Sequence, residues 1–297
     1  MLDKEPEEFR FTSSVQEVWQ YFHRNKPALL CGYLLIALIA LMLLAPWLSP
    51  HNSNMQFVGQ ELLPPSWRSE GKITFFLGTD DLGRDLLSRI ISGLYYTFGS
   101  ALLVTLLTLL IGGLLGIIAG SSQGIKSGIL GHFLDAFLSI PILLLAIIIA
   151  TLMQPSLLNA ILAILLASLP YFIHQIYLAL QTESSKDYVV MLRLDGASKR
   201  YLINQVMLPN LLPTFIRLTS RIFTLAILDI SALSFIALGA QPPQPEWGAM
   251  IREYIDLIYL APWLSILPGF ALMFVILVVL LFSDGLAKAI EKYYRRT

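Results

Sequence analysis

The sequence predicts an all-α polytopic membrane protein with six transmembrane helices. Of its 297 residues, 56% are hydrophobic and only 13% are charged, whereas an ordinary soluble domain carries about 25% charged residues. Six apolar runs reach about the 20 residues that a helix needs to cross a bilayer core. The runs are continuous rather than alternating, which favours helices over the strands of a membrane barrel.

The predicted spans, in chain order, are residues 28–48, 96–119, 133–153, 157–180, 219–239 and 264–282. Their orientation follows from Lys and Arg, which concentrate in cytoplasmic segments. If the N-terminus is inside, the outer segments keep only five of the 20 basic residues, namely Arg68, Lys72, Arg84, Arg89 and Arg252. Both termini and the loop 184–210 are therefore predicted to be cytoplasmic.

Residues 1–94 are predicted to contain a cytoplasmic tail, the first span and an outer segment with an amphipathic helix. The first apolar run is too long for a signal-peptide core and has no small-residue cleavage site after it, so we expect a retained span. Cys31 lies inside this run and is the single cysteine, which excludes an intrachain disulfide. We expect a buried free thiol there.

The amphipathic helix is predicted within residues 77–93, which read LGTDDLGRDLLSRIISG. Thr79 or Asp80 is a suitable N-cap, since its side-chain oxygen can accept from the first free N–H groups. Asp85 and Arg89 are spaced for a weak i,i+4 ion pair. One face of the helix would be apolar, with Leu82, Leu86 and Ile90 on it. We expect the helix to lie at the outer membrane interface.

Residues 95–297 are predicted to form a five-span core. In the second span, Gly112, Gly116 and Gly120 repeat every fourth residue, a spacing that lets another helix approach closely. Pro141 and Pro170 interrupt two later spans, where we expect kinks or gates.

The loop 184–210 between two spans has the composition of a folded element. Residues 186–195 are typical of a helix, and Gly196 can adopt the left-handed conformation that ends one. Ser198 is a suitable N-cap for a second helix over residues 199–208, and Pro209 is expected to stop it. The loop is therefore predicted to be two short helices joined by a sharp turn. The alternative is a helix lying on the lipid surface, which the short length and weak basic charge disfavour.

Four ionisable residues lie within or at the edges of spans: Asp135, His174, Arg221 and Asp229. Such groups are costly in a membrane and are functional candidates by default. Placement at a helix end explains Asp135 and Arg221. Asp229 lies deeper in its span, and two interpretations stay open for it, a polar group of a translocation path and a proton relay.

Several catalytic signatures are absent from the sequence. It has no GxxxxGK[ST] loop for binding ATP, no HExxH motif and no Cys/His cluster. We therefore predict that the chain is not an ATPase or other enzyme and has no cofactor and no metal. The net charge of zero gives no sign of a nucleic-acid partner.

The loop 184–210 resembles the EAA loop of the permease subunits of ABC importers. The resemblance rests on Gly196, on Val206 and on Leu208-Pro209, while Val190-Met191-Leu192 stand where that family has Glu-Ala-Ala. In the family this loop docks on the ATPase. The resemblance therefore implies a set of ATPase-coupling residues: Asp187, Tyr188, Val190, Arg193, Gly196, Ala197, Ser198, Leu208 and Pro209.

Two further segments resemble the dipeptide and oligopeptide branch of these permeases, and within it the C-type permeases of Sap peptide transport systems. The outer motif matches at Gly78, Thr79, Asp80, Gly83, Arg84, Asp85, Ser88, Arg89 and Gly93. The segment 227–250 matches at Leu233-Ser234-Phe235, Gly239, Pro242-Pro243, Pro245 and Trp247-Gly248. The branch usually has Glu at position 230, whereas here Asp229 precedes Ile230. Translocation-path candidates are Asp229, Pro141 and Ser234.

The resemblance implies the type I ABC importer permease fold in a bacterial inner membrane. Its implied partners are a homologous second permease, two cytoplasmic ATPase subunits that hydrolyse ATP, a periplasmic substrate-binding protein and membrane lipid. Peptides, with antimicrobial peptides among them, are the implied substrates, and polyamines, haem and nickel are alternatives in the same architecture. A stand-alone proton-coupled transporter centred on Asp229 and a scaffold protein without a transport path are alternatives of other classes.

Overall fold

The computed structural model describes residues 14–121 and 138–294, and the regular secondary structure in these residues is helical. The helices that build the body are α1 (Ser14–Arg24), α2 (Lys26–Leu48), α3 (Leu86–Leu107), α4 (Gly113–Gly120), α6 (Ile142–Thr151), α7 (Leu157–Ser184), α8 (Asp187–Leu194), α9 (Lys199–Tyr201), α10 (Leu208–Phe235), α11 (Trp247–Glu253) and α12 (Trp263–Tyr294). Extended structure in the described residues is limited to two isolated bridges, Gln56 with Arg84 and Thr79 with Asp85.

Five helices are long and apolar enough to cross a membrane: Lys26–Leu48, Leu86–Gly120, Leu157–Ser184, Lys199–Phe235 and Trp263–Tyr294. The predicted third span, residues 133–153, corresponds in its second half to the shorter apolar helix α6. Its first residues, with Asp135, lie outside the described residues. The all-helical membrane architecture is confirmed, while the count of six spans stays a prediction.

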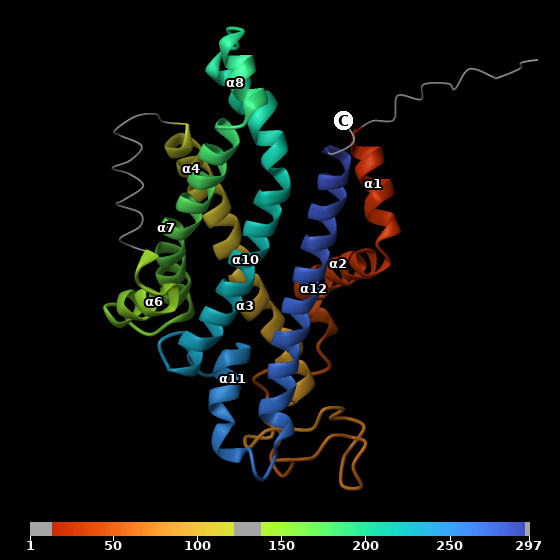
Figure 1. Ribbon diagram of the computed structural model, residues 1–297. Helices are drawn as coiled ribbons and strands as arrows, with labels where there is room; N and C mark the ends of the chain where they lie inside the picture. The colour runs from red at the N-terminus through yellow and green to blue at the C-terminus, as the bar shows by residue number, and fades with distance from the viewer. Residues whose placement is uncertain (1–13, 122–137, 295–297) are drawn as a thin grey trace, which may run out of the picture.

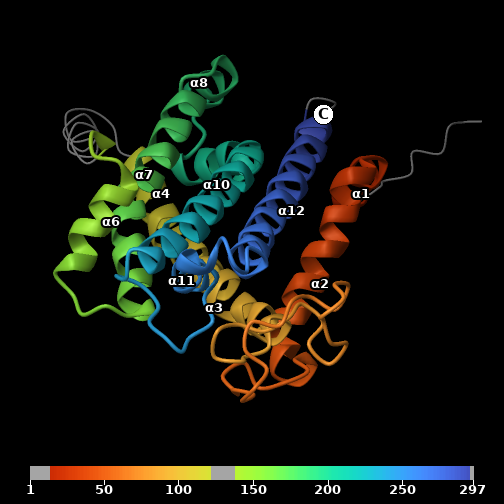
Figure 2. The ribbon, with the colours of Figure 1, turned by 90° about the horizontal axis from the view of Figure 1, so that it is seen from below.

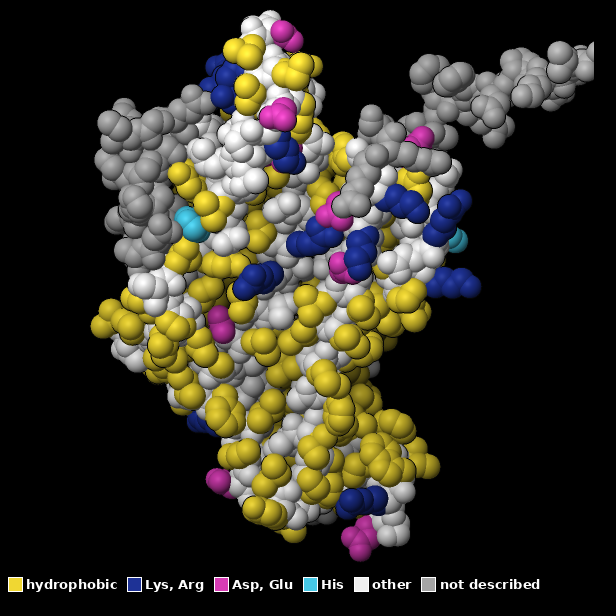
Figure 3. Space-filling view, viewed as in Figure 1, with side chains coloured by type: hydrophobic (Ala, Val, Ile, Leu, Met, Phe, Trp, Pro, Cys, Tyr) yellow, Lys and Arg dark blue, Asp and Glu magenta, His cyan; other side chains and the backbone are white. Residues whose placement is uncertain are grey.

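The two ends of the molecule carry different elements. Figure 1 shows α8 at one end, together with α1 and the C-terminal end of α12, while α11 and the segment 49–85 lie at the opposite end. On the face drawn in Figure 3, charged side chains gather towards the α8 end, and hydrophobic side chains predominate over the other half. The predicted cytoplasmic loop and C-terminus therefore share one end of the molecule, and their orientation relative to the membrane stays a prediction.

The central helices are α3, α7, α10 and α12. In the views of Figures 1 and 2, α10 lies between α7 and α12, with α6 on one flank and α1 on the other. The main buried cluster joins residues of these helices, among them Phe98, Ile164, Ile227 and Val275. A second cluster, around Phe172, fills the space below α8.

The glycine spacing of the second span acts as predicted. A Cβ atom at Gly116 would lie 2.7 Å from Cβ of Ile176, and one at Gly120 would lie 2.8 Å from Cβ of Leu180. Both contacts are closer than two carbon atoms can pack, so glycine is what lets α4 touch α7.

Of the two prolines predicted to interrupt spans, one precedes the start of a helix and the other lies inside a continuous helix. Pro170 lies inside α7, which runs unbroken from Leu157 to Ser184. A proline removes one i→i−4 hydrogen bond, and the remaining bonds and the packed neighbours maintain a long helix. Pro141 behaves differently, because α6 begins directly after it and Pro141 itself is exposed.

Candidate functional site

The loop between α7 and α10 forms the first candidate site. Helix α8 ends in a Schellman motif, in which Ala197 N donates to Leu192 O at 3.0 Å and Gly196 N donates to Arg193 O at 3.1 Å. Gly196 has φ of 88°, the left-handed conformation predicted from the sequence. Ser198 caps the next helix by accepting from Tyr201 N at 3.3 Å. The predicted first helix, the turn at Gly196 and the N-cap of the second helix are therefore confirmed.

The predicted stop at Pro209 is wrong. Helix α9 continues through a π-helical stretch, Leu202–Met207, into α10, so one helix runs from Lys199 to Phe235. Pro209 lies in the first turn of α10, directly after the wider π-helical bonds. The irregular stretch accommodates the missing proline N–H, and the loop connects rigidly to a spanning helix instead of ending before it.

Helix α8 has a buried side and an exposed side. Val189 is fully buried and packs in the cluster that contains Leu180 and Leu211. On the exposed side, Met191 is 64% and Leu194 is 82% exposed, with Val190 beside them. The predicted coupling residues Asp187, Arg193, Gly196 and Ser198 are exposed as well, whereas Ala197, Leu208 and Pro209 are partly buried. The outward face of α8 is therefore mainly apolar.

Tyr188 turns its hydroxyl group inward, which the sequence did not indicate. The hydroxyl donates to Oε1 of Glu183 at the end of α7 and accepts from Nδ2 of Asn210 at 3.0 Å. Burial, and then the bond to Glu183, raises the pKa of Tyr188 to about 12. Lys186 Nζ approaches Glu183 Oε2 at 2.7 Å. No sequence motif marks Glu183, although its two partners, Tyr188 and Lys186, follow it by five and three residues.

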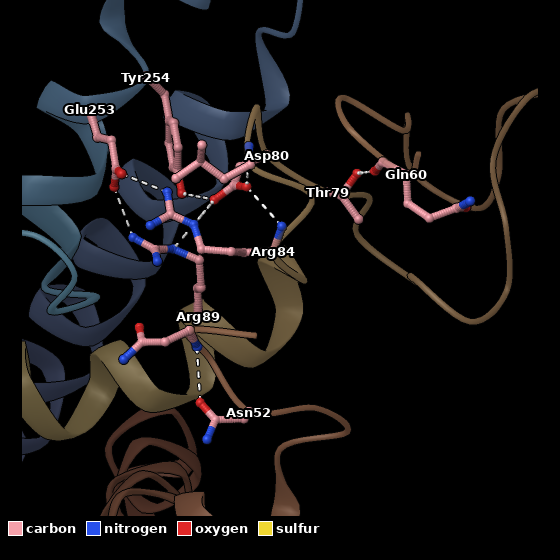
Figure 4. A network of polar contacts seen from close by, with 10 residues as sticks. Asn52, Gln60, Thr79, Asp80, Arg84, Arg89, Glu253 and Tyr254 are labelled. Carbon is pink, nitrogen blue, oxygen red and sulfur yellow. Dashed lines mark hydrogen bonds and ion pairs between the residues drawn. The ribbon is translucent and has the colours of Figure 1, made fainter. Parts of the chain in front are cut away.

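The second candidate site is a buried polar network at the opposite end, shown in Figure 4. Asp80 is fully buried at its centre. Its Oδ2 accepts from Arg84 Nε at 2.6 Å and from the Tyr254 hydroxyl at 2.9 Å, and its Oδ1 accepts from the N–H groups of Leu82 and Arg84. Asp80 therefore stabilises the turn in which it lies and also holds the end of α11 through Tyr254.

Glu253 joins two arginines of the outer motif. It accepts from Nη2 of Arg84 at 2.5 Å through one oxygen and from Nη2 of Arg89 at 2.8 Å through the other. Arg89 is fully buried, and its guanidinium lies over the Tyr254 ring at 6.0 Å. The negative charges of the two carboxylates balance the positive charges of the two guanidinium groups. Burial raises the pKa of Tyr254 well above its usual value, so Tyr254 is neutral and leaves the charge balance unchanged. This arrangement clamps the segment 49–85 to α11.

The predicted helix start in this motif is wrong. Helix α3 begins at Leu86, with Asp85 as its N-cap accepting from Ser88 N at 3.0 Å. Thr79 instead accepts from Leu63 N at 2.9 Å and so anchors the outer loop. Arg89 pairs with Glu253 rather than with Asp85. The helix does not lie on the membrane surface, because it continues directly into the second span, and the predicted division at residue 94 falls inside it.

Two glycines of the motif allow the loop its turns. Gly78 and Gly83 have φ of 87° and 72°. A Cβ atom at Gly78 would lie 2.3 Å from the carbonyl oxygen of Leu63, and one at Gly83 would lie 2.4 Å from that of Phe57. Both positions therefore require glycine for backbone conformation and for space. Ser88 donates to Asp85 at 2.5 Å and accepts from His51 N at 3.0 Å, which fixes the loop after α2.

Glu246 is another buried carboxyl group at this end, and the sequence did not single it out. It caps α11 by accepting from Ala249 N at 2.8 Å, and it accepts from Ser231 of α10 at 3.0 Å and Thr97 of α3 at 3.1 Å. Burial raises the pKa of Glu246, and the N–H groups of Gly248 and Ala249 oppose that rise. Glu246 thereby joins three helices.

The translocation-path candidates lie in three different settings. Asp229 is 7% exposed within α10, and its Oδ2 has no hydrogen-bond partner in the described part of the chain. Ser234 is fully buried and accepts from Ala240 N at 3.1 Å, so it holds the turn after α10. Pro141 is exposed at the start of α6. The structure does not bring these three residues together.

No group of three or more His, Cys, Asp or Glu residues that could hold a metal ion occurs in residues 14–121 and 138–294. Cys31 is buried and free.

The chain matches two family models. Residues 112–296 match the binding-protein-dependent transport system inner membrane component, and residues 13–65 match the N-terminal transmembrane domain of oligopeptide transport permease C. Among solved structures, the chain is similar to inward-facing conformations of the MetNI methionine ABC transporter. One such comparison has a TM-score of 0.57 at 17% identity and covers 68% of this chain and 95% of that chain. This likeness shows the type I ABC importer permease fold.

Curated relatives align over nearly the whole chain. It is 58% identical to the peptide transport system permease protein SapC of Haemophilus influenzae, over 99% of both chains. It is 43% identical to SapC of Salmonella typhimurium, over 95% of this chain and 96% of that protein. It is 38% identical to the dipeptide transport system permease protein DppC of Escherichia coli, over 93% and 92%. The chain therefore belongs to the binding-protein-dependent transport system inner membrane components, as a multi-pass permease subunit of the bacterial inner membrane.

Proposed function

We propose that this chain is one of two permease subunits of an ATP-driven importer and that it moves peptides across the inner membrane. The observation that carries the proposal is the outward face of α8, where Val190, Met191 and Leu194 are exposed at the tip of two long helices. Exposed apolar side chains gathered at one tip are typical of a protein–protein interface. The relative at 58% identity is named as a peptide transport system permease, which supports the substrate class.

In this proposal the ATPase subunits dock from the cytoplasm, one on each permease, and hydrolyse ATP. Asp187, Val190 and Arg193 contact the ATPase, and the turn Gly196-Ala197-Ser198 fixes the angle of α8. Leu208-Pro209 lie within one continuous helix, Lys199–Phe235, so a shift of the loop is passed directly to that spanning helix. The pore lies between this chain and a homologous second permease.

The opposite end is proposed to receive a periplasmic substrate-binding protein. The clamp formed by Asp80, Arg84, Arg89 and Glu253 holds the segment 49–85 against α11. A rigid outer surface suits docking, because less conformational entropy is lost when the partner binds.

Docking is tested by substitution of one exposed residue of α8. Leu194→Asp places a charge in the proposed apolar contact, so the variant should insert in the membrane and no longer co-purify with the ATPase subunits. Leu260→Asp is the matched control, because Leu260 is also exposed (65%) and lies beyond α11, away from α8. Undiminished co-purification of Leu194→Asp would rule out docking at this face.

The substrate is tested in proteoliposomes that hold both permeases and the ATPases, with the binding protein outside and ATP inside. Labelled trialanine, a labelled cationic antimicrobial peptide, putrescine, haemin and Ni²⁺ are the probes. ATP-dependent uptake of a peptide supports the proposal. Uptake of putrescine, haemin or Ni²⁺ in place of the peptides would assign one of the alternative substrates to the same architecture.

A second candidate function is a stand-alone proton-coupled transporter. The observation that favours it is Asp229, a carboxyl group that is buried in a spanning helix with Oδ2 unpartnered among the described residues. A buried carboxyl without a partner is a candidate proton carrier. Liposomes that contain this chain alone and take up trialanine down a pH gradient would favour this function over the first. Under the first proposal, Asp229 is a polar group of the translocation path.

A further inference from the structure

One tyrosine hydroxyl connects the coupling helix to both spanning helices beside it. Tyr188 lies in the first turn of α8, Glu183 in the last turn of α7 and Asn210 in the first turn of α10. The hydroxyl donates to Glu183 and accepts from Asn210 Nδ2 at 3.0 Å. A single side chain on α8 therefore contacts the end of one span and the beginning of another.

The two partners of this hydroxyl keep it in place. Glu183 is 4% exposed, and its second carboxylate oxygen is occupied by Lys186 Nζ at 2.7 Å. A buried carboxylate is stable only when its oxygens are hydrogen-bonded or paired, so Glu183 strongly favours the geometry in which Tyr188 donates to it. Since the pKa of Tyr188 is about 12, the hydroxyl keeps its proton at neutral pH and remains a donor.

Apolar packing alone does not set the rotation of α8. Val189 is the one residue of α8 with a fully buried side chain, and it packs in the cluster with Leu180 and Met207. Hydrophobic contact is non-directional and tolerates a small rotation or slide of so short a helix. Hydrogen bonds weaken steeply when their angle changes, so the Tyr188 bonds are what resist such movement.

We propose that the hydrogen-bond chain Glu183–Tyr188–Asn210 is the link that transmits movement of α8 to α7 and α10. Glu183 and Tyr188 are then positioning residues of the transport cycle. Glu183 is buried and the Tyr188 hydroxyl is bonded within the loop, whereas Met191 and Leu194 face outward toward the partner. The inference rests on the proposed function, since it assigns the mechanical path by which ATPase closure reaches the membrane helices.

The test compares variants that differ in one polar group. Tyr188→Phe keeps the ring and removes the hydroxyl, and Tyr201→Phe is the matched control on an exposed tyrosine of the same loop. The assembly of two permeases, two ATPases and binding protein is reconstituted, and trialanine moved per ATP hydrolysed is measured. Tyr188→Phe should lower this ratio about five- to tenfold, the equivalent of one strong hydrogen bond. Tyr201→Phe should leave it within about twofold of wild type.

Two variants of Glu183 separate the link from a general loss of folding. Glu183→Gln keeps an oxygen that accepts from Tyr188, so its ratio should stay within about twofold of wild type. Glu183→Ala should lower the ratio as much as Tyr188→Phe does. The double variant should lower it no further than either single variant, because the effects of substitutions within one hydrogen-bond network are not additive. A structural role alone would not produce rescue by glutamine together with non-additivity.

The outcomes separate this inference from the function on which it rests. A wild-type assembly that takes up neither trialanine nor the cationic antimicrobial peptide in an ATP-dependent way would overturn the peptide-transport proposal, and the inference with it. Wild-type uptake together with an unchanged ratio in Tyr188→Phe would overturn the link alone. Additive losses in the double variant would also overturn it, because they would show that Glu183 and Tyr188 act separately.

Discussion

Replacement of Glu253 by glutamine should destabilise the outer end of the molecule. Glu253 accepts from Arg84 at 2.5 Å and from Arg89 at 2.8 Å, and the two arginines are 3% and 0% exposed. Glutamine has nearly the same shape but no charge and one acceptor oxygen. One guanidinium group would therefore face an NH₂ group, donor against donor, and the network would carry one uncompensated positive charge.

The size of the effect follows from burial. Removal of one partner of a buried ion pair costs about 3–5 kcal/mol. The Glu253 side chain is 21% exposed, and Asp80 still faces both arginines, at 2.6 Å from Arg84 Nε and 3.8 Å from Arg89 Nε. Both facts place the cost at the lower end, about 3 kcal/mol. For a chain of this length, at about 2 °C per kcal/mol, the melting temperature should fall by about 6 °C.

The measurement is thermal unfolding of the purified chain in detergent, followed by the loss of its monodisperse size-exclusion peak. Glu70→Gln is the control, because Glu70 is an exposed glutamate of the same outer segment. The double variant Arg84→Gln/Glu253→Gln removes one charge of each sign and should lose less than the sum of its two single variants. A shift below about 1 °C in Glu253→Gln, or strict additivity in the double variant, would refute the charge-balance argument.

Three further predictions follow from single contacts. Gly196→Val should reduce the amount of trialanine moved per ATP, because φ of 88° strains a β-branched residue, although a Cβ atom there would meet nothing within 4 Å. Asn tolerates this conformation, so Gly196→Asn should stay near wild type, and equal losses in both variants would contradict the backbone explanation. Gly116→Leu should separate α4 from α7 and cost about 3 kcal/mol or more in thermal unfolding, whereas Gly269→Ala, with open space around its Cβ position, should be neutral. Glu246→Ala should lower the melting temperature by about 4–6 °C, because Ser231, Thr97 and Ala249 lose their common acceptor. Glu246→Gln should recover part of that loss, and an unchanged melting temperature in Glu246→Ala would contradict the role assigned to Glu246.

The local signals in the sequence were read correctly where the physics is local. A left-handed glycine and a serine cap depend on neighbouring residues, so the roles of Gly196 and Ser198 follow from the sequence. The close approach at Gly116 follows from helical spacing in the same way. The apolar runs likewise predicted the long helices, because burial of a helix in lipid requires about 20 apolar residues in sequence.

The sequence predicts incorrectly where another interaction or an irregular backbone overrides the preference of a single residue. Asp80 is a good N-cap by residue type, yet Arg84 and Tyr254 bind its carboxylate and the helix begins after Asp85. Pro209 is a helix breaker by residue type, yet the π-helical stretch before it lets the helix continue. The bond from Tyr254 in the first case and the irregular backbone in the second outweigh a propensity of about 1–3 kcal/mol.

The sequence by itself determined the membrane class, the long helices, the turn at Gly196 and the likeness to ABC importer permeases, because composition, spacing and short motifs carry these directly. Only the tertiary structure decided which polar groups meet. Arg89 and Glu253 are 164 residues apart, and Tyr188 meets Asn210, 22 residues further on, only when α8 has packed beside α10. Such pairs leave no periodic trace in the chain, since each partner alone has the residue type of an ordinary surface charge or aromatic residue. The physical reason is that long-range hydrogen bonds depend on the packing of apolar helices, which the spacing of residues does not specify.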